Sequence, residues 1–174
     1  MIVPSPTDQA SLGCYRASVS ESVRRFMAFA VDEANAGLVH HDVPVGAVVV
    51  TADGTVLARR HNERERTGDP TAHAEILALR DAAAALGRWR LDGCTLIVTL
   101  EPCPMCAGAA VAARIATVVF GAADPKGGAC GSLYNLAVDP RLNHQMTVVP
   151  GVMADEAADL LLRFFAERRD PDGA

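Results

Sequence analysis

Two short segments of the chain, with the sequences H-A-E and P-C-P-M-C, hold the residue types best suited to chemistry. His73, Cys103 and Cys106 supply one imidazole and two thiols, which are ligands that suit zinc. Three protein ligands leave the fourth tetrahedral position open to water, and zinc-bound water can supply hydroxide at neutral pH. Glu75 is not needed as a ligand, so we interpret it as the group that carries protons. The pattern predicts a hydrolytic zinc site.

A structural zinc site is the alternative explanation for a C-x-x-C pair, but such sites normally have four protein ligands. The other histidines lie in predicted loops or turns and have no ligand-like neighbour; they are His40, His41, His61 and His144. Glu101 directly precedes the P-C-P-M-C segment, and we interpret it as a hydrogen-bonded structural carboxylate rather than as a functional acid. The sequence therefore favours an open, three-ligand site.

Hydrophobic periodicity predicts the elements that must position these residues. Helices are predicted over residues 20–37, 71–87, 102–113 and 154–168, the first capped by Ser20 and the third opened by Pro102. Apolar, β-branched runs predict strands over 43–50, 55–60, 94–100, 117–120 and 146–149. An Asp-Gly turn joins the first two strands into a hairpin. The polar stretch 62–71 and the glycine-rich stretch 122–131 are predicted loops.

This order of elements predicts an α/β fold, a three-layer α/β/α sandwich around a mixed five-stranded sheet. Right-handed crossovers place both motif helices beside the same edge of the sheet. Both motifs fall at helix N-termini, where α/β proteins place their sites and where thiolates are stabilised. We expect a single domain over residues 20–169, with a flexible N-terminal extension at 1–19 and a flexible tail at 170–174.

Composition restricts the location and the partners. Half of the 174 residues are hydrophobic, yet no run is long enough for a membrane span and no signal pattern opens the chain. The cysteine count of five is odd, and two of them form the C-x-x-C pair, which fits a reducing compartment. We therefore expect a cytoplasmic protein. The net charge of −5 argues against nonspecific binding of nucleic acid but leaves room for a local basic surface.

The combination of H-x-E with P-C-x-x-C resembles the zinc-dependent cytidine and nucleobase deaminase superfamily. Other segments are similar to the bacterial tRNA-specific adenosine deaminases: D-V-P-V-G-A-V, D-P-T-A-H-A-E-I, T-L-E-P-C-P-M-C-A-G-A and V-V-F-G-A. The resemblance covers about residues 21–169 and implies a cytidine deaminase-like fold. It also implies hydrolytic deamination of adenosine to inosine at wobble position 34 of an arginine tRNA with anticodon ACG.

By this resemblance His73, Cys103 and Cys106 bind one zinc ion per subunit, and Glu75 is the proton donor and acceptor. The implied partners are the tRNA anticodon stem-loop and a second copy of the chain, because the family is homodimeric.

The resemblance also assigns four residues to the substrate. Asn62 matches a base-contacting asparagine, whose amide can pair with both edges of adenine. Asp124 falls where the family contacts an anticodon-loop ribose. Pro102 belongs to a turn, residues 100–103, expected to offer backbone N–H groups near the substrate. Phe164 resembles an aromatic residue that packs beside the RNA, with core packing as the alternative.

Two other functions stay open. A deaminase of free guanine or cytosine would share the D-P-T-A-H-A-E and P-C-P-M-C segments, whereas T-L-E before the cysteines and residues 114–143 after them favour tRNA. A noncatalytic zinc module is the second alternative, and Glu75 argues against it. Ala123 stands where family members often have arginine, which bears on RNA affinity and not on chemistry.

Overall fold

The computed structural model describes residues 21–169, and their centre is one five-stranded sheet in the order β2-β1-β3-β4-β5. The strands are β1 (Gly46–Val50), β2 (Val56–His61), β3 (Thr95–Leu100), β4 (Thr117–Ala122) and β5 (Thr147–Val149). Strand β1 pairs antiparallel with β2 and β3, whereas β3, β4 and β5 run parallel. The predicted mixed five-stranded sheet is confirmed, including the hairpin of β1 and β2.

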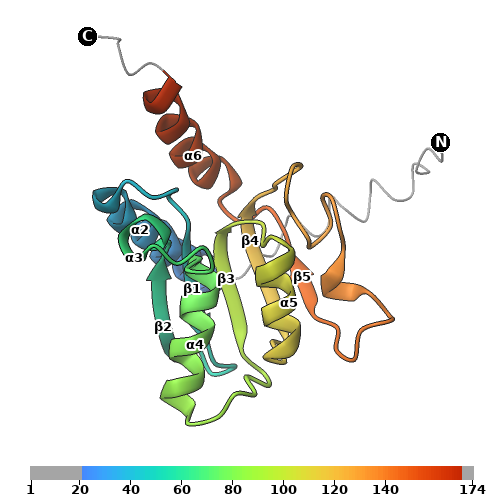
Figure 1. The fold of residues 1–174 in the computed structure, drawn as a ribbon. Helices are drawn as coiled ribbons and strands as arrows, with labels where there is room; N and C mark the ends of the chain where they lie inside the picture. The colour runs from blue at the N-terminus through green and yellow to red at the C-terminus, as the bar shows by residue number, and fades with distance from the viewer. Residues whose placement is uncertain (1–20, 170–174) are drawn as a thin grey trace, which may run out of the picture.

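Helices cover both faces of this sheet (Figure 1). The long ones are α2 (Glu21–Gly37), α4 (Ala74–Leu86), α5 (Pro104–Ala112) and α6 (Ala154–Arg169), and the short ones are α3 (Arg64–Thr67), η1 (Leu38–His40) and η2 (Leu136–Val138). Helices α4 and α5 lie side by side on one face, while α2 and α6 pack on the other. The predicted three-layer α/β/α sandwich is confirmed. No helix within residues 21–169 has the length and apolar character needed to cross a bilayer.

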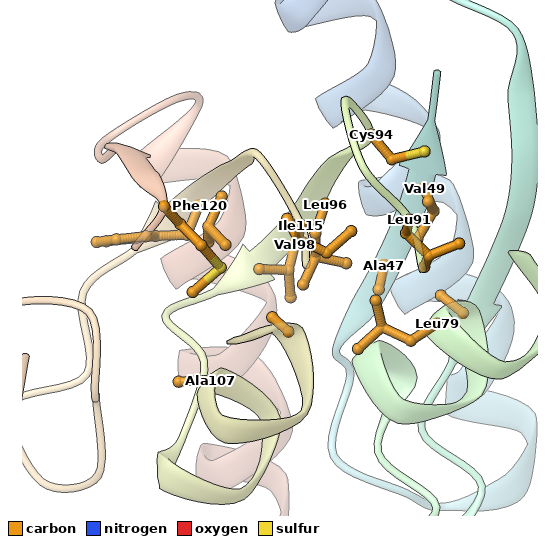
Figure 2. Close-up of a cluster of buried hydrophobic side chains, with 14 of the residues drawn as sticks. Ala47, Val49, Leu79, Leu91, Cys94, Leu96, Val98, Ala107, Ile115 and Phe120 are labelled. Carbon is orange, nitrogen blue, oxygen red and sulfur yellow. The ribbon is translucent and has the colours of Figure 1, made fainter. Parts of the chain in front are cut away.

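The core explains why α4 and α5 sit so close to the strands. Alternate residues of a strand face opposite sides, so Val48 packs towards α2 while Val49 packs towards α4. Figure 2 shows the larger cluster, to which Leu79 of α4 and Leu96 and Val98 of β3 all belong. Half of the buried residues of α4 and of α5 are alanine, which lets both helices approach the sheet closely. This packing fixes the two helix N-termini that carry the motifs.

Several predicted boundaries differ from the structure: β1 begins at Gly46 instead of residue 43, β4 extends to Ala122 instead of residue 120, and three further differences lie near the motifs. Helix α5 begins at Pro104 and not at Pro102, because a residue before proline avoids helical angles and Cys103 is held extended at φ −69° and ψ 172°. Helix α4 begins at Ala74, three residues later than predicted, with His73 as its extended N-cap. The predicted loop 62–71 contains the one-turn helix α3. The expected cap Ser20 and both expected flexible ends lie outside the described residues.

Candidate functional site

The structure brings the three predicted zinc ligands together at the N-termini of α4 and α5. The Nδ1 atom of His73 lies 3.9 Å from Cys103 Sγ and 3.6 Å from Cys106 Sγ. Tetrahedral zinc with ordinary Zn–S and Zn–N bonds would separate its nitrogen and sulfur ligands by about 3.5 Å. All three donor atoms lie within 4.8 Å of one another, so the residues fit the ion.

No further histidine of residues 21–169 joins this group. His61 Nδ1 lies 3.2 Å from Glu33 Oε2, and its ring stacks on that of His40. His144 Nε2 lies 2.6 Å from the carbonyl oxygen of Ile115. A three-ligand site with an open position is therefore what the described part of the chain offers, in agreement with the sequence prediction.

Asn62 explains how a histidine can occupy a helix N-cap and still bind metal. An N-cap side chain usually accepts a hydrogen bond from the first turn, but His73 makes none. Instead, Asn62 Oδ1 accepts the backbone N–H of Ala74 at 2.9 Å, and Asn62 Nδ2 donates to the Val43 carbonyl at 3.0 Å. This arrangement frees the His73 imidazole to face the cysteines. It also occupies part of the amide that the sequence analysis assigned to the base.

The two thiols differ sharply in proton affinity. The pKa of Cys103 is lowered to about 4 because the Cys106 thiol donates to its sulfur and His73 adds a second favourable contact. The same hydrogen bond, together with burial, raises the pKa of Cys106. The contact with Cys103 also raises the pKa of His73. Negative charge is thus already stabilised at this helix N-terminus, which suits a site for a cation.

Glu75 is the second residue of α4 and is only 4% exposed. Its Oε2 atom is buried and has no hydrogen-bond partner. Burial raises the pKa of the Glu75 carboxyl. A buried acceptor without a partner costs stability, and such atoms are rare in folded proteins. The side chain also lines the pocket described next, so this oxygen is available to a group bound there.

A pocket of about 140 Å³ opens beside the ligand group. Its lining residues are Val43, Val45, Asn62, Arg64, His73, Glu75, Leu100, Glu101, Cys103 and Asp124. Val43, Val45 and Leu100 form apolar walls, and the remaining residues supply polar groups. Apolar walls with a few fixed polar groups are typical of small-molecule and base pockets.

Five of the lining residues are predicted site residues, and they come from four separate stretches of the sequence: Asn62, His73, Glu75, Cys103 and Asp124. Asp124 Oδ1 accepts the N–H groups of Lys126 and Gly127 at 2.9 and 3.1 Å. Both of these bonds use the same oxygen, so Oδ2 takes no part in them.

Pro102 and Phe164 are not among the lining residues. Pro102 is buried and has no N–H, and the Glu101 N–H donates to the Ala122 carbonyl at 2.9 Å. The turn at 100–103 therefore offers fewer free donors than predicted. Phe164 is 7% exposed, lies 5.3 Å from the Phe165 ring and has the Arg168 guanidinium 4.3 Å from its centroid. Its part in substrate binding stays a prediction.

Asp42 supports Arg64 at the pocket, and this contact was not predicted from the sequence. Asp42 is buried, accepts the Glu65 N–H at 3.0 Å, and lies 3.6 Å from Arg64 Nε. Asp42 thus places a guanidinium at the pocket. A signal was present, since an acidic residue directly before V-P-V-G opens an otherwise apolar strand.

Comparison with known proteins gives three findings. Residues 20–122 match the cytidine and deoxycytidylate deaminase zinc-binding region. The chain is 51% identical over 144 residues to the tRNA-specific adenosine deaminase of Bacillus subtilis, covering 83% of this chain and 89% of that protein. It also resembles the solved structure of a tRNA:A34 deaminase of A-to-I editing at the wobble position, with a TM-score of 0.76, 45% identity, and coverage of 79% and 99%.

A guanine deaminase from Bacillus subtilis is similar as well, with a TM-score of 0.55 and 42% identity. That match covers 57% of this chain and 63% of the other. The likeness to the tRNA:A34 deaminase therefore extends over more of the chain.

Proposed function

The chain belongs to the cytidine and deoxycytidylate deaminase family, and we propose that it converts adenosine to inosine at wobble position 34 of a tRNA by zinc-dependent hydrolytic deamination. The observation that carries the chemistry is the buried, unpartnered Glu75 Oε2 beside a three-ligand metal group. The identity of the substrate is supported by the tRNA-specific relatives. We further propose an arginine tRNA with anticodon ACG, recognised through its anticodon stem-loop by a cytoplasmic homodimer.

His73, Cys103 and Cys106 would hold the zinc ion. Zinc in a three-ligand site supplies hydroxide at neutral pH. Glu75 would take one proton of the attacking water and pass it to N1 of the adenine ring, and would then take the remaining proton from the new C6 hydroxyl and deliver it to the departing amino group. The new C6–O bond forms, the C6–N6 bond breaks, and ammonia leaves. Glu75 Oε2 suits this role because it is buried and has no hydrogen-bond partner in the protein.

The pocket orients the base for this attack. Val43, Val45 and Leu100 provide apolar surfaces on which a ring can lie. Asn62 keeps one amide hydrogen beyond the bond to Val43, and that hydrogen can reach an acceptor of the base. A wobble base is in a single-stranded loop, where it can be splayed into a pocket at modest cost. Asp124, at the pocket, would meet the sugar that follows the base into the site.

Deamination of a free base is the second candidate, because a guanine deaminase is 42% identical to this chain in a match that covers 57% of it. Free guanine or cytosine would need only the part of the pocket beside the metal ligands and Glu75. The tRNA proposal also uses Arg64, a half-exposed guanidinium at the pocket, for the RNA backbone. A noncatalytic zinc module would have no use for the unpartnered oxygen of Glu75.

The test is inosine formation in a synthetic anticodon stem-loop carrying ACG, run beside free guanine, cytosine and adenosine. A stem-loop carrying GCG is the matched control because it lacks adenine at position 34. We expect inosine in the ACG stem-loop alone, and its loss in Glu75→Ala with zinc content unchanged. Ammonia from a free base without RNA turnover would establish the free-base activity instead. Zinc binding without any turnover would establish the binding module. Sedimentation of the wild type tests the homodimer.

A further inference from the structure

Glu101 is a second buried carboxylate at the pocket, and the proposed chemistry does not use it. It follows β3 directly and is 2% exposed. Its Oε1 accepts the backbone N–H groups of Cys130 at 2.9 Å and Ser132 at 3.0 Å. Its Oε2 accepts the Asp124 N–H at 3.0 Å and the Ser132 hydroxyl. Four donors from a segment more than twenty residues away thus converge on one side chain.

These bonds fasten residues 124–134, which we name the rim loop, to the end of β3. The loop also folds around the carboxylate. The Gly128 N–H donates to the Asp124 carbonyl at 2.8 Å, and a Cβ on Gly128 would overlap the Glu101 carboxylate. The Ala129 N–H donates to the Pro102 carbonyl at 2.8 Å. The rim loop therefore keeps its shape because Glu101 occupies its centre.

Only an ionised carboxylate satisfies this arrangement. Two oxygens without protons accept four donors, whereas an amide has one acceptor oxygen and would place its own N–H groups against donors. With all four contacts in use, Glu101 has no oxygen left for proton transfer. Its own backbone N–H pairs with the Ala122 carbonyl, so the main chain leading to Cys103 is held without the side chain.

We infer that Glu101 is a positioning residue for the RNA: it holds the rim loop so that Asp124 stays at the pocket, and it thereby sets the affinity for the stem-loop rather than the rate of the chemical step. This inference rests on the proposed function. Its basis is the hydrogen bond from Asp124 to Glu101, which joins a predicted substrate residue to the buried carboxylate.

The test is Glu101→Gln, assayed with the ACG stem-loop. Loss of one or more hydrogen bonds to a charged acceptor should raise KM by about tenfold or more, while kcat changes by less than about threefold. Zinc content should stay at the wild-type level. Hydrogen exchange should become faster at the amides of Asp124, Cys130 and Ser132, because these N–H groups lose their acceptor. That local readout does not depend on activity.

Three further variants separate positioning from general damage. Gly128→Ala should reproduce the rise in KM, because its methyl group displaces the carboxylate. Ser132→Ala removes only the hydroxyl donor and should give a smaller rise, and it serves if Glu101→Gln does not fold. Thr99→Val is the matched control: Thr99 is buried in β3, and its Oγ1 accepts the Gly46 N–H at 3.1 Å, away from the rim loop. It should lower the melting temperature and leave KM unchanged.

The outcomes are distinguishable. If the wild type forms no inosine in the stem-loop, the proposed function fails and this inference fails with it. If the wild type is active and Glu101→Gln loosens the rim loop without raising KM, the inference alone is overturned. A fall in kcat at unchanged KM, or a loss of zinc, would place Glu101 in the metal site and would also overturn it.

Discussion

The first turn of α4 and the end of β3 each place a glutamate at the same pocket, and the two side chains differ in almost every contact. Glu75 and Glu101 are 4% and 2% exposed. Glu75 Oε2 has no partner, whereas the two oxygens of Glu101 accept four hydrogen bonds. Burial raises the pKa of Glu75. Burial acts on Glu101 in the same direction, but the bonds from Ser132, Asp124 and Cys130 outweigh it and lower the pKa.

This contrast shows that burial of a carboxylate does not by itself reveal its role. A satisfied carboxylate stabilises the fold around it, because each donor loses its partner if the charge is removed. An unsatisfied one costs stability and is retained where a ligand will meet it. The number of hydrogen-bond partners, rather than the depth of burial, therefore separates Glu75, which we propose carries protons, from Glu101, which we infer positions the rim loop.

Removal of the metal should give the largest loss of activity. It should loosen the helix starts around Glu75 and leave the rim loop around Glu101 unchanged. Dialysis against a chelator should abolish inosine formation, and added zinc should restore it. The first turns of α4 and α5 carry the ligands, so their amides should lose protection from hydrogen exchange. The amides bonded to Glu101 should keep theirs. Loss of protection in both regions would show that the rim loop depends on the metal and would break the comparison.

The next largest effects are expected from Glu75→Gln and Glu101→Gln, which should act in opposite ways: the first should lower kcat without lowering stability, and the second should lower stability. Glu75→Gln should lower kcat by about 10²–10⁴-fold, because the proton carrier is lost. Its free energy of unfolding should equal or exceed that of the wild type, since a buried carboxyl with an unpartnered oxygen is replaced by a neutral amide. Glu101→Gln should lose about 2 kcal/mol of unfolding free energy. Urea denaturation of both variants at equal zinc content is the measurement. Equal losses of stability would contradict the contrast.

The sequence was sufficient for the ligands and for the sheet. The three ligand residues, His73, Cys103 and Cys106, are chemically distinctive. Their prediction does not depend on the exact residue at which each helix begins. Strands β1 and β3 are β-branched and apolar, so their type follows from local preference. Even the start of α5 was predictable in principle, because Pro104 excludes Cys103 from the helix.

The contacts that support the site were not predictable in the same way. Asn62 meets Val43 and Ala74, and Glu101 meets residues 124–132, and no local preference encodes such pairings. A glycine-rich stretch indicates a close approach but does not name the partner. The sequence analysis did interpret Glu101 as a structural carboxylate, and the structure supplies the bonds that bear this out.

A smaller effect is expected from Asn62→Ala, which tests how far this amide supports the start of α4 and the position of the His73 ring. The Ala74 N–H would lose its acceptor, and loss of such a cap costs about 1 kcal/mol. The His73 ring would lose its fixed position, so zinc affinity should also fall. Zinc titration and urea denaturation measure the two effects. Asn35→Ala is the control, because Asn35 Nδ2 bonds only its own helix at the Val31 carbonyl, 2.9 Å away, and both readouts should stay unchanged.

The smallest effect is expected at Asp139, a carboxylate whose charged partner is exposed to solvent. Arg141 holds the pKa of Asp139 at about 2 through side-chain and backbone hydrogen bonds, yet its own side chain is 86% exposed. In Arg141→Ala that pKa should return towards about 3.9, as an NMR titration would show. Because the folded pKa is depressed, the pair stabilises the fold above the unfolded pKa, and this contribution disappears as the pH falls through about 2. Solvent screening makes the contribution small, so the melting temperature at pH 7 should barely change. A decrease as large as that of Glu101→Gln would show that an exposed partner stabilises a carboxylate as much as buried partners do, and the distinction between the two pocket glutamates would then need another cause.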